Sequence, residues 1–267
     1  MPKDNRSANN AFLNDVVSAI PGFPSDFCFT CLMDLLDMQH EQRWKGSLLE
    51  IGVYAGRFAA VLAREAARRS SHLVGLDPFM KFSESEVRER LEAAAEFESA
   101  KGAKQSAKIT LIKDLSGNWT PDRLLGMLGE RCRFVHIDGS HLRADVLWDL
   151  TIADSIISPY GVIALDDYHN PQCLGVAEAT FQFLSSQSRL SVPFAFVAGK
   201  LLLSGRLHAA KYKSRLEAYV SSDTVWGISR LYQRRMKNGA TWLNQMLMGS
   251  EIAVIAGEGS ANSRRLS

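Results

Sequence analysis

The sequence has few cysteines and no long apolar run, and each absence excludes a class of protein. The four cysteines are too few and too scattered for a disulfide framework, so we expect free thiols at Cys28, Cys31, Cys132 and Cys173. Cys28 and Cys31 also lack the second pair that a zinc ribbon needs. No apolar stretch approaches the roughly 20 residues of a membrane-spanning helix. The first ten residues lack the apolar core of a signal peptide, and we therefore expect a cytoplasmic protein.

The chain also lacks a large net charge of either sign. The net charge of +2 is too small to imply a polyanionic partner by itself. A chain of 267 residues with 46% hydrophobic residues can bury one sizeable core with added terminal extensions. We divide it into an N-terminal helical extension (1–45), a core (46–204), and a basic helical C-terminal segment with a disordered tail (205–267).

The core alternates between short apolar runs and helical patterns. The runs predict buried strands at 48–51, 72–77, 109–112, 134–137 and 162–165. This alternation is typical of an α/β fold with a doubly wound parallel sheet and helices on both faces. Two further runs, 194–197 and 201–203, are joined only by Ala198, Gly199 and Lys200. So short a link requires an antiparallel hairpin.

The flanks carry weaker signals. Residues 1–10 are polar and expected to be disordered, and two helices are predicted between Ala11 and Gln42. Eight Lys or Arg residues fall within 205–249, either as a solvated basic face or as a cap that offers Arg to an anionic substrate. Apolar spacing at 225–236 predicts an amphipathic helix that packs on the core or on another subunit. A homo-oligomer formed through the terminal helices therefore stays open, and 252–256 could form a short edge strand.

The first chemical motif follows the first strand. Glu50-x-Gly52-x-x-x-Gly56 ends a buried strand and opens directly into a helix. Glycines at such a turn allow close approach of a ligand, and the helix N-terminus presents unpaired N–H groups to it. The spacing differs from the dinucleotide fingerprint G-x-G-x-x-G. Because Glu50 would repel phosphate, a cationic or zwitterionic nucleoside is the better-fitting ligand. Asp77, which ends the second strand, is placed to bind a ribose diol.

Three more carboxylates end the fourth and fifth strands. Asp138 follows 134–137, and Asp166 and Asp167 follow 162–165. A right-handed crossover helix between neighbouring parallel strands would bring all three to the same edge of the sheet, where open α/β folds bind ligands. Converging acids of this kind need a cation. The alternative interpretation is that each acid only caps a turn or the next helix.

These motifs resemble class I S-adenosylmethionine-dependent methyltransferases. LEIGVYAG is similar to the first motif of catechol O-methyltransferase-like enzymes, and IDGSH with GVIALDDYHNPQC is similar to the macrocin O-methyltransferase branch. The resemblance covers about 46–204. It implies a Rossmann-like sheet of strand order 3-2-1-4-5-7-6 with strand 7 antiparallel, in agreement with the hairpin deduced above.

The resemblance also implies a cofactor and an activity. S-adenosyl-L-methionine would bind with its methionine part beside Glu50, Gly52, Tyr54 and Gly56, its ribose on Asp77, and its adenine near Asp114 or Ser116. Asp138, Asp166 and Asp167 would hold Mg²⁺ or another divalent cation, which favours oxygen ligands. The implied activity is metal-assisted O-methylation of a small-molecule hydroxyl on a sugar or aromatic moiety.

The sequence departs from the family pattern at three positions. Phe58 stands where related catechol enzymes have a small hydroxyl residue that helps to hold the cofactor. Ser140 stands where macrocin-like enzymes often have an acid proposed as the base. His141 occupies the place of the basic lysine of the catechol enzymes and is our candidate base, acting with Asp138.

Two other functions stay open at this point. One is an S-adenosylmethionine-binding protein that has lost its chemistry, which Phe58 favours and the intact acids oppose. The other is a nucleic-acid methyltransferase that uses the basic segment. The chain lacks an Asn-Pro-Pro-Tyr or Asp-Pro-Pro-Tyr motif after the fourth strand and aromatic residues interleaved in the basic segment, which makes this second alternative weaker.

Overall fold

The computed structural model describes residues 6–22, 26–99, 107–222 and 244–255. Two sequence predictions, the amphipathic helix at 225–236 and the disordered tail at 257–267, lie outside the described residues. Within the described residues, the structure contains no helix with the length and apolar character required to span a bilayer.

The described strands form one sheet of order β3-β2-β1-β4-β5-β7-β6-β9-β8. Their bounds are β1 Ser47–Ile51, β2 His72–Asp77, β3 Lys108–Lys113, β4 Cys132–Ile137, β5 Ile157–Leu165, β6 Ser191–Val197, β7 Lys200–Gly205, β8 Asn244–Leu247 and β9 Ser250–Ile255. The first five are parallel to one another, and β7 is antiparallel to both β5 and β6. The fold class and the order of the first seven strands are therefore confirmed.

The C-terminal strands correct one prediction. A strand does form where the sequence pattern at 252–256 indicated one, but it is not at the edge of the sheet. β9 pairs in parallel with β6, and β8 pairs antiparallel with β9 and forms the outer strand. β9 is covered on both sides, which agrees with the full burial of Ala253 and Ile255.

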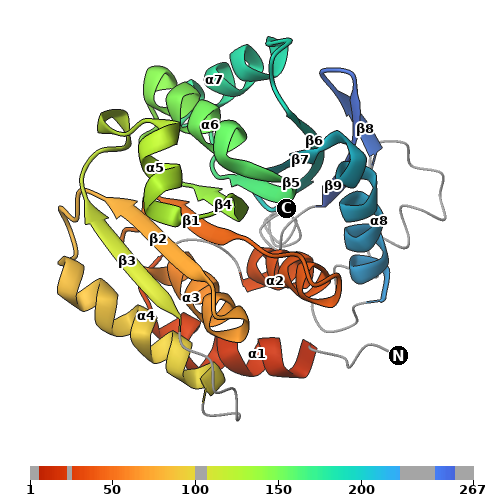
Figure 1. Cartoon of the computed structure of the whole chain (residues 1–267). Coiled ribbons are helices and arrows are strands. Elements are labelled where there is room, and N and C mark those ends of the chain that lie inside the picture. Colours follow the sequence, from red (N-terminus) through yellow and green to blue (C-terminus); the bar gives the residue numbers. More distant parts are fainter. Residues whose placement is uncertain (1–5, 23–25, 100–106, 223–243, 256–267) are drawn as a thin grey trace, which may run out of the picture.

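Helices cover both faces of the sheet (Figure 1). One apolar cluster joins the sheet to α1 Arg6–Asp15, α2 Asp26–Glu41, α3 Arg57–Arg69, α4 Glu84–Ser99 and α8 Arg206–Ser222. The other joins it to α5 Pro121–Leu128, α6 Arg143–Ile156 and α7 Leu174–Ser185. Two short 3₁₀ helices, η1 and η2, span Val17–Ala19 and Ser116–Asn118.

Local signals account for several helix starts. Ser83 and Glu86 form the expected capping box: the Ser83 amide donates to the Glu86 carboxylate at 2.8 Å, and the Glu86 amide donates to the Ser83 hydroxyl. Thr120 caps α5, which has Pro121 at its first position. The prediction that residues up to 10 are disordered is wrong from Arg6 onward, because α1 begins there.

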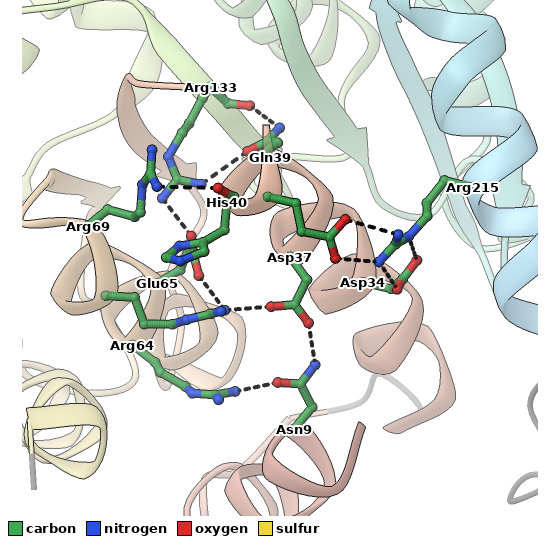
Figure 2. A network of polar contacts seen from close by, with 12 residues as sticks. Asn9, Asp34, Asp37, Gln39, His40, Arg64, Glu65, Arg69, Arg133 and Arg215 are labelled. Carbon is green, nitrogen blue, oxygen red and sulfur yellow. Dashed lines mark hydrogen bonds and ion pairs between the residues drawn. The ribbon is translucent and has the colours of Figure 1, made fainter. Parts of the chain in front are cut away.

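A buried polar network explains why such a polar sequence is helical (Figure 2). Asn9 of α1 is 6% exposed, donates to Asp37 of α2 at 2.9 Å and accepts from Arg64 of α3. Arg68 of α3 bridges Asp37 and Glu65 at 2.7 and 2.9 Å. Arg6, which donates to Ser222, and Asn9 therefore have partners that are distant in the sequence.

The same network reaches the sheet and α8. Glu65 lies 3.0 Å from Arg133 of β4, and both side chains are almost fully buried. Arg215 of α8 forms ion pairs with Asp34 and Glu41 of α2 (Figure 2). Both terminal segments thus bind the core through buried or half-buried charges. The three-part division of the chain and the homo-oligomer stay predictions.

Candidate active site

Sheet pairing places the acids of the fourth and fifth strands side by side. The Asp138 amide donates to the Ile51 carbonyl at 2.8 Å, and the Asp166 amide donates to the Ile137 carbonyl at 2.9 Å. The ladder thus continues one residue beyond β4 and β5. One oxygen of each carboxylate and one ring nitrogen of His136 lie within 4.8 Å of one another. The structure therefore brings Asp138 and Asp166 together at the carboxyl edge of the sheet.

Gly52 is required for this approach. It has a φ of +86°, and a Cβ atom at this position would lie 2.0 Å from the Asp138 carbonyl oxygen. The main chain after β1 and the main chain after β4 are therefore in direct contact. Any side chain at residue 52 would push Asp138 away from its position.

Asp77 shapes the glycine turn. Its carboxylate accepts the Tyr54 amide at 2.8 Å and the Phe79 amide at 2.5 Å, and the residue is 9% exposed. Gly56 is the N-cap of α3 in the left-handed conformation and gives the helix no side-chain cap. The Asp77 carboxylate thus holds the turn through two backbone amides. The N–H groups at the start of α3 have no capping side chain.

Asp114 and Ser116 lie beyond β3, near the start of η2. The Asp114 carboxylate accepts from the Leu115 amide, the Asn118 amide group and the Trp119 indole at 2.6–3.0 Å. The Asn118 and Leu115 hydrogen bonds lower the pKa of Asp114. Asp114 organises this loop, and its role toward adenine stays a prediction.

A buried chain of side chains runs beneath the acids. Glu50 Oε1 lies 2.8 Å from His136 Nδ1, and His136 Nε2 lies 2.9 Å from Lys200 Nζ. Lys200 also forms an ion pair with Asp166. Glu50, His136 and Lys200 are at most 2% exposed, and these contacts join β1, β4, β7 and the end of β5.

Charge states in this chain follow from burial. Burial and the nearby Lys200 ammonium lower the pKa of His136 well below its usual value, so the ring is neutral. A neutral ring that accepts from Lys200 at Nε2 donates to Glu50 from Nδ1. Burial and the nearby Asp138 carboxylate raise the pKa of Glu50 well above its usual value. Glu50 Oε2 is buried and has no hydrogen-bond partner.

The pKa values of the two adjacent acids, Asp138 and Asp166, shift in opposite directions. Burial would raise the pKa of Asp166, but the Lys200 ammonium outweighs it and brings that pKa to about 2. Burial and the Asp166 carboxylate raise the pKa of Asp138 well above its usual value. Burial favours neutral Lys200, yet Asp166 raises its pKa. The arrangement is therefore an Asp166–Lys200 ion pair beside Asp138, whose pKa is shifted in the opposite direction from that of Asp166.

The Asp167 side chain contacts different partners from those of Asp166. Its φ is +57°, a conformation that Asp tolerates better than most residues. One carboxylate oxygen accepts from Asn170 at 2.8 Å and the other lies 3.0 Å from His141 Nε2. His141 is half-exposed, and its Nδ1 lies 3.2 Å from the Cys173 sulfur. Asp167 thus orients the imidazole of our candidate base.

Sequence reasoning missed His136, Lys200 and the role of Phe58. The Phe58 ring centroid lies 4.2 Å from that of His136 and 6.0 Å from Lys200 Nζ, so Phe58 covers the buried chain. The available signal was a lone histidine in the apolar strand FVHI, directly opposite Glu50 in the ladder. Lys200 lies in the link predicted from the sequence, and in the structure it is the first residue of β7.

Comparisons with known proteins now define the class. Residues 49–168 match the sequence profile of a methyltransferase domain. The fold is similar to the apo structure of CalS11, a TDP-rhamnose 3′-O-methyltransferase of calicheamicin biosynthesis, with a TM-score of 0.51 and 16% identity over 76% of this chain and 96% of that one. It is similar to cofactor-bound Rv0187 from MTB, with a TM-score of 0.50 and 16% identity over 76% of this chain and 91% of that one.

At these identities the structural likeness establishes the fold alone. No curated protein sequence matches the chain significantly. The match over 49–168 spans the glycine turn and all three acids of the fourth and fifth strands. Residues 49–168 therefore match a methyltransferase domain, and the described sheet has the fold of the neighbours named above. The S-adenosylmethionine-dependent methyltransferase predicted from its motifs is confirmed as the enzyme class.

Proposed function

We propose that the protein transfers a methyl group from S-adenosylmethionine to a hydroxyl oxygen of a small molecule, on a sugar or aromatic moiety. One observation carries the proposal: a half-exposed His141, oriented by Asp167, lies at the sheet edge where Asp138 and Asp166 meet. The sugar O-methyltransferase activity named for CalS11, which shares the fold, agrees with this assignment.

The described residues fit the cofactor. The turn Gly52–Gly56 and the uncapped start of α3 suit a ligand that approaches the main chain closely. Glu50 Oε2 is buried without a partner at the end of β1, and an orphaned carboxylate oxygen suits the positive charge of a sulfonium or ammonium group. Tyr54 and Asp77 shape the same turn.

The transfer requires in-line attack on the methyl carbon. The hydroxyl oxygen forms the new C–O bond while the S–CH₃ bond breaks and its electron pair stays on sulfur. In the proposed step, His141 Nε2–H donates to Asp167, and Nδ1, which lies 3.2 Å from the Cys173 sulfur, accepts the hydroxyl proton. Asp167 fixes this tautomer and stabilises the imidazolium that forms.

The predicted Mg²⁺ ligands do not fit this arrangement. Asp166 already forms an ion pair with Lys200, and Asp167 already has His141 and Asn170 as partners. Both nitrogens of His136 are engaged. Of the three predicted acids, Asp138 is the one without a basic partner among the described residues. We propose that the Lys200 ammonium supplies the cation that the acids require, and no step of the reaction is assigned to a metal.

The test is methyl transfer from S-adenosylmethionine to a panel of sugar and aromatic alcohols, measured as S-adenosylhomocysteine release. His141→Ala should lower kcat by roughly 10²- to 10⁴-fold, since it removes the general base. Calorimetry should show unchanged S-adenosylhomocysteine affinity for this variant. His169→Ala is the matched control, because His169 is exposed on the same loop and has no role in the proposed step.

Two outcomes would contradict the proposal. If no alcohol is methylated although S-adenosylhomocysteine binds, the chain is a binding protein of this fold. If His141→Ala retains most of its turnover, a different residue is the base.

A further inference from the structure

A pocket lies at the edge of the sheet opposite to Asp138 and Asp166. It has a volume of about 520 Å³ and is formed where β5 and β6 begin, β7 ends and α8 begins. Its lining comprises Arg131, Ile157, Ser158, Pro159, Arg189, Leu190, Ser191, Gly205, Arg206, Leu207 and His208. β4 separates this edge from Asp138 by six residues, or about 20 Å at the rise of a strand. The pocket is therefore distinct from the methyl-transfer site.

The lining contains three arginines and no acidic side chain, and the nearby Asp154 carboxylate accepts the Leu190 and Ser191 amides. Arg131, Arg189 and Arg206 form no ion pair with any described residue, and no acidic residue lines the pocket. Arg131 donates to the Ser155 and Ile157 carbonyls, which holds its guanidinium in place. Arg189 Nη1 donates to the Ser186 carbonyl, while its Nε is buried without a partner.

The start of α8 adds to this field. The helix has 17 residues, and its first turn contains Arg206 and no acidic residue. A cation at a helix N-terminus opposes the macrodipole, which favours negative charge at that end. An anion in the pocket would satisfy the exposed N–H groups and the arginines together.

Ser191 supplies an independent sign of a ligand. Its side chain is fully buried, lines the pocket, and its hydroxyl has no hydrogen-bond partner. The Ser191 amide donates to Asp154 at 2.8 Å, so the backbone that carries the hydroxyl is fixed. A buried hydroxyl without a partner is unfavourable unless a ligand provides one.

The pocket also has apolar walls. Leu190 is 58% exposed and Leu207 is 86% exposed, and Ile157 and Pro159 also line the pocket. A fully hydrated inorganic ion would leave these side chains in water. A ligand with an anionic head and a short apolar body would cover them.

We propose that this pocket binds a small organic anion whose phosphate or carboxylate head contacts Arg189, Arg206 and the Ser191 hydroxyl. The apolar body of the ligand packs against Leu190 and Leu207. This site is independent of the proposed methyl transfer, and its test does not require a known methyl acceptor.

The experiment is calorimetric titration of the full chain with hexyl phosphate, hexanoate and inorganic phosphate. One of the two amphiphilic probes should bind at least about tenfold more tightly than inorganic phosphate, and its identity reveals the head group. The double variant R189Q/R206Q should weaken that binding by at least about tenfold, because charge-assisted hydrogen bonds to the head group are lost. Arg88→Gln, which breaks an exposed pair with Glu84, is the matched control and should leave it unchanged.

Ser191→Ala separates binding from folding. It should weaken binding of the same probe by about fivefold without lowering the thermal midpoint, because the hydroxyl has no partner inside the protein. Equal binding by the wild type and the double variant would overturn the proposal. Absence of binding by all three probes up to about 5 mM would overturn it as well.

Discussion

Replacing Lys200 by Met tests whether the active edge contains its own cation. Methionine has a similar length and no charge, so the change removes the ammonium from between His136 and Asp166. Loss of one partner from a buried ion pair costs about 3–5 kcal/mol. Protonation of Asp166 offsets part of this loss, because its low pKa depends on Lys200. We therefore expect unfolding in urea to report a destabilisation of about 3 kcal/mol at neutral pH.

The same variant should acquire a metal site. At an effective dielectric constant of about 20, two unit charges 4 Å apart repel by about 4 kcal/mol, and a divalent ion beside the ammonium meets about twice that value. This repulsion opposes Mg²⁺ binding in the wild type. In Lys200→Met it is absent, and Asp138 and Asp166 offer adjacent oxygens. Calorimetry with Mg²⁺ should show binding to the variant and none to the wild type at millimolar concentrations.

Controls make this result decisive. Lys213→Met removes a lysine that pairs with the exposed Glu251 and should cost no more than about 1 kcal/mol. Lys200→Arg keeps the charge and should remain unable to bind Mg²⁺, even where its larger head lowers stability. If wild-type enzyme binds Mg²⁺ tightly and loses turnover in chelator, the Lys200 argument is refuted and the sequence-based magnesium prediction is restored.

Three further perturbations follow from the structure. Glu65→Gln leaves the buried Arg133 without its carboxylate partner, while Arg68 keeps Asp37, and it should cost about 3–5 kcal/mol in urea unfolding. Glu84→Gln, at a partly exposed pair, should cost under about 0.5 kcal/mol; equal costs would contradict the network of Figure 2. Gly52→Ala should abolish S-adenosylhomocysteine binding in calorimetry, while Gly126→Ala, with nothing within 4 Å of its new methyl group, should preserve it. Burial raises the pKa of Asp149 from 3.8 to about 6. Because the folded state binds this proton more tightly, stability should fall by about 3 kcal/mol as pH rises from about 3 to about 7. Asp149→Asn should flatten that part of the profile, and an unchanged slope would refute the assignment.

The sequence predicted the core because its signals are local. Apolar runs ended by carboxylates, the three-residue link at 198–200 and the capping box at Ser83 each depend on neighbours in the chain. The carboxyl edge was predictable for the same reason, since parallel strands bring their ends to one side. The adjacency of Asp138 and Asp166 follows from that topology without knowledge of side-chain contacts.

The missing parts depend on partners that are remote in the sequence. Asn9 lies in a segment whose polar composition predicts disorder, whereas its helix is held by Asp37 and Arg64, which are distant in the sequence. Lys200 belongs to the three-residue link predicted from the sequence, and its ion pair with Asp166 depends on the antiparallel pairing of β7 with β5. Spacing in one strand cannot reveal an ion pair that joins residues 34 positions apart.

Phe58 lies against the buried polar chain that contains Lys200, and the two residues are best explained together. An ammonium group buried at the end of a sheet is stable only when acids and acceptors surround it and water is excluded. Asp166 and His136 provide the first condition, and the Phe58 ring, 4% exposed and packed on His136, provides the second. A small hydroxyl residue at position 58 would open this chain toward the cofactor turn. The departure from the catechol enzymes at Phe58 is therefore better explained as protection of the internal cation than as loss of the cofactor site.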